Sequence, residues 1–240
     1  MSTSIVALII VLGVLIFFHE LGHFVYNYRG VEGQLCTKFE GSRIIRALRA
    51  ALRGPRRKGS ARRDMDLLLV PRLAPRVLAL ILRWANEVMS DVVAAHILGP
   101  AYYYAFRHFL HTAPISGERF SLSHPAPLYR LALVWQTLVQ DEWEEPVRTL
   151  TPKAHQWASE HSLAKISVGP DAYVSSALEH CPQVCDWIVP WFHKFVIPEI
   201  RQAASTATEK ARIRPFHFGR FHARVVADLA HCVNPLNEHV

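Results

Sequence analysis

The segment His19-Glu20-Leu21-Gly22-His23 combines two imidazoles and a carboxylate at a spacing that suits metal-assisted hydrolysis. Residues four apart lie on one face of a helix, so His19 and His23 can bind the same ion. Glu20 lies beside them and can take a proton from an attacking water whose pKa a zinc ion lowers. The alternative, a helix with incidental polar residues, is disfavoured because uncompensated ionisable groups in an apolar helix are costly. The segment is therefore predicted to bind zinc, with Glu20 as the general base.

A catalytic zinc ion needs a third protein ligand and one open position. Glu87 is the candidate, because it lies in an apolar stretch that the spacing predicts to be a helix over residues 76–98. Asp91 is four residues later and therefore on the same helix face, where it can accept a hydrogen bond from the outer nitrogen of a ligating histidine. The alternative is that both acids face solvent. Buried carboxylates normally need a partner or a metal ion, so we predict that Glu87 is a ligand.

The motif HELGH, followed by Glu-x-x-x-Asp on a later helix, resembles the gluzincin peptidases related to HtpX and the CAAX prenyl endopeptidases. The resemblance implies a zinc-dependent endopeptidase that hydrolyses peptide bonds in peptide or protein substrates. It also implies a single zinc ion held by His19, His23 and Glu87. In the same pattern Glu20 is the catalytic residue and Asp91 supports the ligands.

A further similarity to that family covers the segment Ser123-His124-Pro125 together with Arg130. It resembles a His-Pro…Arg segment, which implies that His124 and Arg130 lie near the active site. Position 90 is Ser where the family usually has Ala. The resemblance covers about residues 15 to 135 and leaves the rest of the chain unplaced.

A second resemblance concerns the N-terminal region alone. The residues after HELGH resemble the opening of the site-two proteases, which are intramembrane zinc peptidases, through Arg29, Gly30, Val31 and Phe39. That family takes its third ligand from an Asp in a later Asp-Gly motif, and no such segment occurs in this sequence. After Asn234-Pro235, position 237 is Asn where the motif requires Asp, and no Asp-Gly pair follows. This architecture is the second choice and shares the zinc chemistry of the first motif.

Residues 5–18 form an unbroken apolar run, and a helix continuing through HELGH to residue 26 would be about 20 residues long, near the length that crosses a bilayer. The run lacks the basic start and small-residue cleavage site of a signal peptide. Membrane association is therefore predicted, and the run is either a transmembrane helix or a buried core helix. In the first case, the positive charges that follow would keep the bulk of the chain in the cytoplasm.

The net charge of +7 is concentrated, because nine Arg and Lys residues fall between Arg43 and Arg63. Within this stretch, apolar residues at helical spacing alternate with arginines, which suits a basic amphipathic helix at a membrane surface. A solvated helix and linker is an equal alternative. No nucleic-acid-binding motif accompanies the charge, so nucleic acid is not expected as a partner.

The fold class is predicted to be mainly α, with a helical zincin-like metallopeptidase core and an N-terminal apolar helix, because no alternating strand pattern of useful length occurs. Pro71 and Pro75 are expected to interrupt the apolar stretch before the helix at 76–98, and Gly99-Pro100 to end that helix. Half of the residues are hydrophobic, which excludes a disordered chain. The predicted regions are residues 1–28 with HELGH, 29–66 as basic linker and amphipathic segment, 67–140 as helical core, and 141–240 as a helical region of unknown role.

The remaining polar residues have ordinary expected roles. His96 is expected to pack or hydrogen-bond, and Tyr102, Tyr103 and Tyr104 to pack in the core rather than to line a substrate groove. The four cysteines are too scattered for a disulfide framework and are expected to be reduced thiols. The alternative to a peptidase is a non-enzymatic, membrane-associated or scaffolding protein that retains a metallopeptidase-like fold.

Overall fold

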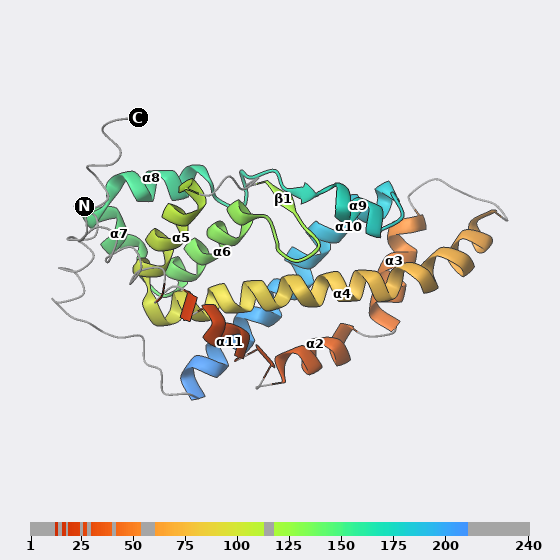
Figure 1. Ribbon diagram of the computed structural model, residues 1–240, viewed down its shortest axis with the longest axis horizontal. Helices are drawn as coiled ribbons and strands as arrows, with labels where there is room; N and C mark the ends of the chain where they lie inside the picture. The colour runs from red at the N-terminus through yellow and green to blue at the C-terminus, as the bar shows by residue number, and fades with distance from the viewer. Residues whose placement is uncertain are drawn as a thin grey trace.

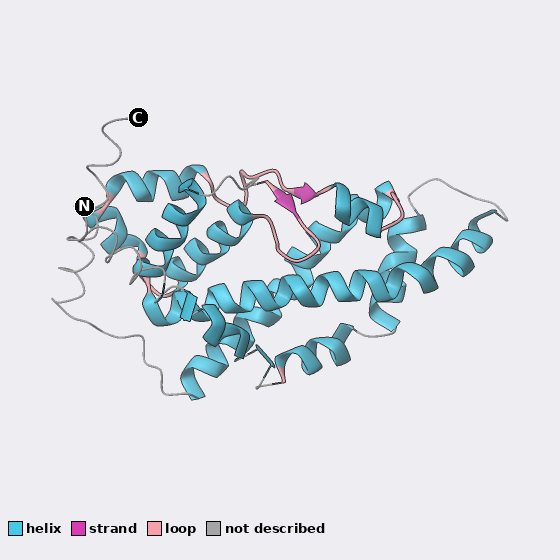
Figure 2. Ribbon diagram, in the orientation of Figure 1, coloured by secondary structure: helices cyan, strands magenta, loops and turns pink. Residues whose placement is uncertain are grey.

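The computed structural model describes residues 13, 16, 17, 19–24, 26, 27, 30–39, 42–53, 61–112 and 118–210 of the chain. These residues are mainly helical, as predicted (Figure 2). The helices after the N-terminal helical segment (residues 19–24) are α2 (Val31–Phe39), α3 (Ser42–Arg53), α4 (Ala61–Leu98), α5 (Pro100–Thr112), α6 (Pro127–Gln140), α7 (Glu144–Leu150), α8 (Pro152–Glu160), α9 (Ala172–Ala177), α10 (Pro182–Trp191), the π-helix η1 (Phe192–Val196) and α11 (Ile197–Lys210).

Helix α4 runs the length of the molecule, and α2, α3, α6 and α11 all pack against it (Figure 1). Its buried side chains form the centre of the larger hydrophobic core, with Leu73, Ile81, Trp84 and Met89 fully enclosed. A smaller core joins the end of α4 to α5, α6, α7 and α8. Because α4 reaches both cores, it is the element that can place residues from distant parts of the chain around one point.

The expected break at Pro71 and Pro75 does not occur, because α4 continues through both prolines from Ala61. A proline inside a helix frees the carbonyl four residues earlier and crowds the same side of the helix. The two prolines are four residues apart and both exposed, so their effects fall on the solvent side of α4. The opposite face buries Val70, Leu73 and Val77, which stabilises the helix across the prolines. The expected boundary between residues 66 and 67 therefore lies inside a helix.

The end of α4 falls at Gly99-Pro100 as predicted, and further boundaries carry ordinary helix-start signals. Gly99 adopts a positive φ of 59° between α4 and α5, a conformation that favours glycine. Helices α6, α8 and α10 carry proline in their first turn, where its missing N–H is not needed. Asp171 caps α9 by accepting a hydrogen bond of 2.7 Å from the backbone N–H of Val174.

The two strands are short. Strand β1 (Arg119–Phe120) pairs in parallel with β2 (Gly169–Pro170), so that Arg119 lies opposite Gly169 and Phe120 opposite Pro170. Their hydrogen bonds connect the loop before α6 to the segment before α9. The pair therefore steadies the chain that leads into residues 121–125.

Helix α3 has the predicted amphipathic pattern, but its apolar face is buried. Ile44, Leu48 and Leu52 lie in the main core, and α3 contacts both α4 and α10. Arg43, Arg46 and Arg49 are exposed on the other side. The apolar side of this helix is therefore not available for insertion into a membrane.

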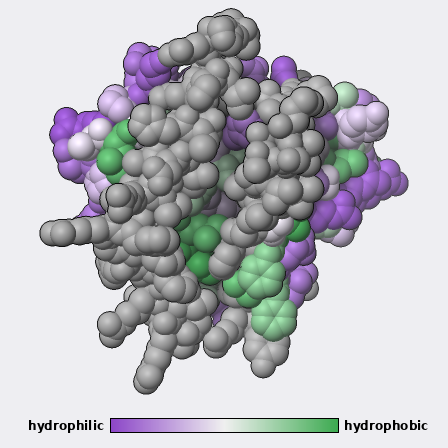
Figure 3. Space-filling model, turned by 60° about the vertical axis from the view of Figure 1, so that its left-hand side comes forward, coloured by the Kyte–Doolittle hydropathy of each residue, from purple (hydrophilic) through white to green (hydrophobic). Residues whose placement is uncertain are grey.

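Most of the predicted transmembrane run, residues 5–26, lies outside the described residues. Across the part of the chain that the structure describes, no helix combines the length and apolarity that crossing a membrane requires. Large hydrophobic side chains are nevertheless exposed on the N-terminal helix at Ile16, Phe17 and Phe24. Hydrophobic side chains also meet the solvent on the face drawn in Figure 3, bordered by hydrophilic ones.

Candidate metal centre

The N-terminal helical segment, residues 19–24, lies directly on α4, as predicted. Gly22 is buried at the contact, and a Cβ at this position would come 2.8 Å from the carbonyl oxygen and 2.9 Å from the Cβ of Ser90, and closer still to its Cα. Four residues after Gly22, the Tyr26 hydroxyl donates to the carbonyl of Leu82 over 3.4 Å. Only a glycine opposite a small residue lets the two backbones approach this closely. The close approach brings the HELGH side chains to the level of Glu87.

Replacing Gly22 by alanine should separate these helices. The added methyl group meets backbone atoms that cannot move aside, so we expect a loss of about 1–3 kcal/mol of unfolding free energy. Zinc affinity should fall at least about tenfold, because the histidines move relative to Glu87. Gly33→Ala on α2 is the matched control, since a Cβ there meets nothing within 4 Å. Denaturant unfolding and zinc titration measure both effects, and equal behaviour of the two variants would contradict this account of the contact.

The structure brings His19, His23 and Glu87 together, with one potential ligand atom from each lying within 4.8 Å of the others. The two Nε2 atoms are 3.1 Å apart, and each is 3.6 Å from a carboxylate oxygen of Glu87. A tetrahedral zinc site with bonds of about 2.0–2.2 Å has ligand atoms about 3.3–3.6 Å apart. The three side chains therefore have the spacing of ligands around one ion.

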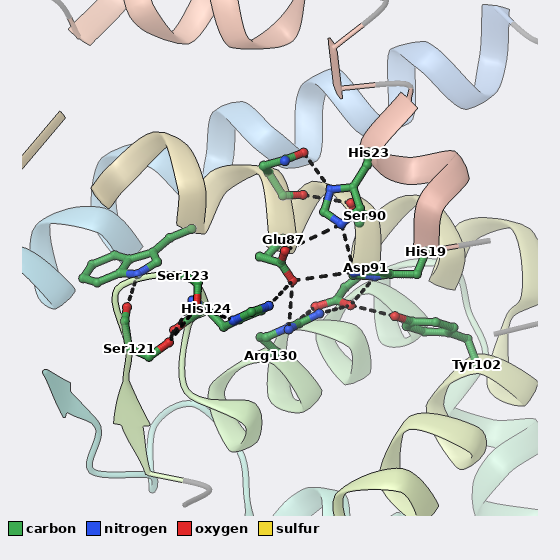
Figure 4. Close-up of polar contacts among 12 residues, drawn as sticks. His19, His23, Glu87, Ser90, Asp91, Tyr102, Ser121, Ser123, His124 and Arg130 are labelled. Atoms are coloured by element: carbon green, nitrogen blue, oxygen red, sulfur yellow. Dashed lines mark hydrogen bonds and ion pairs between the residues drawn. The ribbon is translucent and has the colours of Figure 1, made fainter. Parts of the chain in front are cut away.

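The outer nitrogens of both histidines are held by acceptors on α4 (Figure 4). His19 Nδ1 lies 3.4 Å from Oδ1 of Asp91, as predicted, and His23 Nδ1 lies 2.9 Å from Oδ1 of Asn86. Acceptors at Nδ1 favour the tautomer with hydrogen on that nitrogen, which leaves the Nε2 lone pairs facing the common point. Asn86 was not among the residues predicted from the sequence, although a polar amide inside an apolar helix beside Glu87 was the available indication.

Arg130 on α6 joins the two carboxylates from below the histidines (Figure 4). Its Nε and one terminal nitrogen contact Asp91 at 2.6 and 2.9 Å, and the other terminal nitrogen lies 3.0 Å from Glu87. Tyr102 adds a hydrogen bond of 2.6 Å from its hydroxyl to Asp91, whose side chain is 1% exposed. Arg130 and Asp91 are thus placed near the site as expected, whereas Tyr102 has a polar role that core packing alone does not describe.

The electrostatic balance keeps both carboxylates ionised. Burial alone would raise the pKa of Asp91, but the Arg130 guanidinium and the hydrogen bond from His19 hold it far below its usual range. Burial likewise opposes ionisation of Glu87, yet His19 and Arg130 lower the pKa of that carboxyl. Burial next to Asp91 raises the pKa of Tyr102, which therefore stays protonated and donates. Two carboxylates face one guanidinium, so one negative charge remains for a cation to balance.

In the metal-free protein, a proton on His19 partly balances the negative charge of the carboxylates. Burial lowers the pKa of His19, but hydrogen bonds to Asp91 and Glu87 outweigh it and raise the pKa to about 9. A raised histidine pKa stabilises the fold at pH values below the unfolded value of about 6.5, and this contribution is lost as pH rises toward 9. A metal ion would take the place of this proton.

The unfolding free energy of the metal-free protein should therefore fall between pH 6.5 and 9, by about 1–3 kcal/mol through His19. The His19→Gln variant provides the comparison, because it lacks the titrating group and should show a smaller decrease. Urea unfolding in the presence of a chelator measures the difference. A pH dependence that is identical in both proteins would contradict the raised pKa.

The loop before α6 presents His124 at the open side of the site. The Trp84 indole on α4 donates a hydrogen bond of 2.8 Å to the carbonyl of Ser121, which anchors the loop. His124 Nδ1 lies 2.7 Å from the Ser123 hydroxyl, and its Nε2 lies 3.6 Å from Glu87 (Figure 4). The His124 side chain is 54% exposed. One ring nitrogen is thus fixed by the loop while the other points toward the candidate ligands from the solvent side.

The other singled-out residues lie apart from this cluster. His96 forms a hydrogen bond of 2.7 Å with Asp141, in agreement with the expected role. Tyr103 packs in the smaller core, and the Tyr104 hydroxyl contacts Thr151. Cys36, Cys181 and Cys185 are not joined in disulfides. Among the described residues, the His19, His23 and Glu87 group is the single cluster with metal-binding spacing. His217, His222, His231 and Cys232 lie outside the described residues.

Comparison with known proteins adds no relative to this geometry. No protein-family model, curated protein or solved structure matches the chain.

Proposed function

We propose that this protein is a zinc-dependent endopeptidase. The observation that carries the proposal is the convergence of His19, His23 and Glu87, with the outer histidine nitrogens held by Asp91 and Asn86. Polar residues that lie on apolar helices for unrelated reasons have no cause to show both the convergence and the contacts at the outer nitrogens. A ligand set with oriented imidazoles and a supporting carboxylate is what a zinc site requires.

A bound zinc ion would supply Lewis acidity, polarising the carbonyl of the scissile bond and lowering the pKa of water toward neutrality. The protein supplies the proton transfers. Glu20 follows His19 on the same helix and is exposed, so its carboxylate can accept the proton of the attacking water and pass it to the leaving amine. It is not among the three converging side chains, which separates its role from that of a ligand.

His124 is the group best placed to interact with the substrate on the open side. Its Nε2 faces the site beside Glu87, and the hydrogen bond at Nδ1 restricts the rotation of the ring. A donor in this position can stabilise the negative charge that develops on the carbonyl oxygen during attack. Arg130 is less suited to this task, because its guanidinium is already bound to Asp91 and Glu87.

The direct test is metal content and cleavage of an unstructured protein such as casein by the purified chain. We expect one zinc ion per chain and cleavage that a chelator abolishes and added zinc restores. Protein without bound metal after purification in zinc-containing buffer would count against the metal centre. Zinc-loaded protein that cleaves nothing across a broad substrate set would instead support a binding or scaffolding role for the same fold.

A further inference from the structure

The outward face of α3 is a strongly basic surface that the metal centre does not use. The helix contains four arginines and no acidic residue, and it belongs to a stretch from residue 42 to 63 with nine positive and no negative side chains. Ile44, Leu48 and Leu52 bury the opposite face in the core, so the orientation of the helix is set. Arg43 and Arg49 are exposed in consequence. The fold thus presents Arg43 and Arg49 to solvent in a fixed arrangement.

A row of aromatic side chains lies next to the start of α3. Trp187 on α10 is followed by Trp191 at a ring distance of 5.4 Å, and Trp191 by Phe195 at 5.5 Å. Phe39, three residues before α3, packs edge-on against Trp191, and α3 contacts α10 directly. Trp187 is partly buried and Trp191 is buried, whereas Phe195 at the end of the row is 44% exposed. The exposed Lys194 lies over the Phe195 ring.

We propose that the arginine face of α3, together with the exposed Phe195 and Lys194 at the end of the aromatic row, docks this protein on an anionic membrane surface. Basic residues are attracted by anionic lipid headgroups, and aromatic rings beside basic side chains favour the headgroup region. The buried apolar face of α3 makes this a peripheral electrostatic contact that does not insert the helix. The docking surface is separate from the metal ligands, so the proposal does not depend on the proposed peptidase activity.

The rest of the chain favours a membrane over a nucleic acid as the anionic partner. Phe24 is exposed on the N-terminal helical segment, and Ile16 and Phe17 are exposed before it, Phe17 to 63%. The sequence before them, residues 5–18, is continuously apolar. An apolar run followed along the sequence by a basic cluster is a membrane-associated pattern, and the exposed apolar side chains offer nothing to a phosphate backbone.

The test is co-sedimentation of the full chain with two kinds of vesicle, phosphatidylcholine alone and phosphatidylcholine with about 30% phosphatidylserine. The wild type should prefer the anionic vesicles, and rising salt should weaken that preference. Arg43→Gln combined with Arg49→Gln should lower the partition coefficient for anionic vesicles about 30-fold, at about 1 kcal/mol for each charge. Both side chains are exposed, so circular dichroism should show an unchanged fold.

Arg148→Gln combined with Lys153→Gln is the matched control. It removes the same charge from exposed positions of α7 and α8, at the opposite end of the molecule from α3 (Figure 1). This variant should bind anionic vesicles within a few-fold of the wild type. Equal losses in the two variants, or equal wild-type binding to neutral and anionic vesicles, would overturn the assignment to α3. Tighter wild-type binding to a DNA duplex than to anionic vesicles, lost in the α3 variant, would overturn the membrane as the partner.

Discussion

Replacing Glu20 by glutamine should leave the fold and zinc binding intact and lower peptide cleavage by a factor of about 100 or more. Glutamine has nearly the same volume and hydrogen-bonding shape, but it cannot accept the proton of the attacking water. The side chain is exposed and is not one of the three that converge, so its replacement removes no ligand and leaves no cavity. Casein cleavage and zinc content, measured on the same sample, separate the two properties.

Glu32→Gln is the control for this experiment, since Glu32 is the next acidic residue along the chain and is also exposed. It should keep both activity and zinc, because it lies on α2 and outside the converging group. Full cleavage by the Glu20→Gln protein would end the proposed mechanism. Loss of zinc together with activity would show that Glu20 supports the metal site and is not solely a base.

Replacing Glu87 by glutamine should remove zinc as well as activity. The carboxylate supplies an anionic ligand next to two neutral imidazoles, and an amide oxygen is a much weaker ligand for zinc. Arg130 adds to the effect, because its guanidinium lies 3.0 Å from the Glu87 carboxylate and would then face the ion with one negative charge fewer to balance it. We expect zinc affinity to fall by more than about 100-fold, measured by competition with a chromophoric chelator.

Glu199→Gln is the control variant. Glu199 on α11 is also a partly buried glutamate in an ion pair, which it forms with Lys38 on α2. It should retain zinc and activity, because an ion pair of this exposure contributes little. His23→Ala should resemble Glu87→Gln in losing both properties. A Glu87→Gln protein that binds zinc as tightly as the wild type would remove Glu87 from the ligand set, whatever its activity.

Local sequence pattern is sufficient to predict the three candidate ligands. His19 and His23 are four residues apart in one helix, so their common face follows from helix geometry alone. Glu87 is distant in sequence, but a carboxylate inside an apolar helix indicates a buried partner, and the structure places it 3.6 Å from both imidazoles. The membrane-spanning prediction, whose run lies mostly outside the described residues, stays a prediction.

The supporting contacts depend on how helices lie against each other. Tyr102 reaches Asp91 while its neighbours Tyr103 and Tyr104 do not, because the rotation of α5 after Gly99 selects one of three identical side chains. Asn86 reaches His23 only because Gly22 lets the two backbones approach closely. No periodicity along the chain encodes such an inter-helix distance.

The sequence by itself determined the mainly helical fold, the facing histidines and the choice of Glu87, because each follows from periodicity or from the cost of burying charge. The tertiary structure decided what those rules leave open. Helix α4 continues through Pro71 and Pro75, because burial of its opposite face outweighs the loss of hydrogen bonds to carbonyls that solvent can satisfy. The tertiary structure also bound Arg130 to both carboxylates at once, since only the packing of α6 on α4 sets that distance.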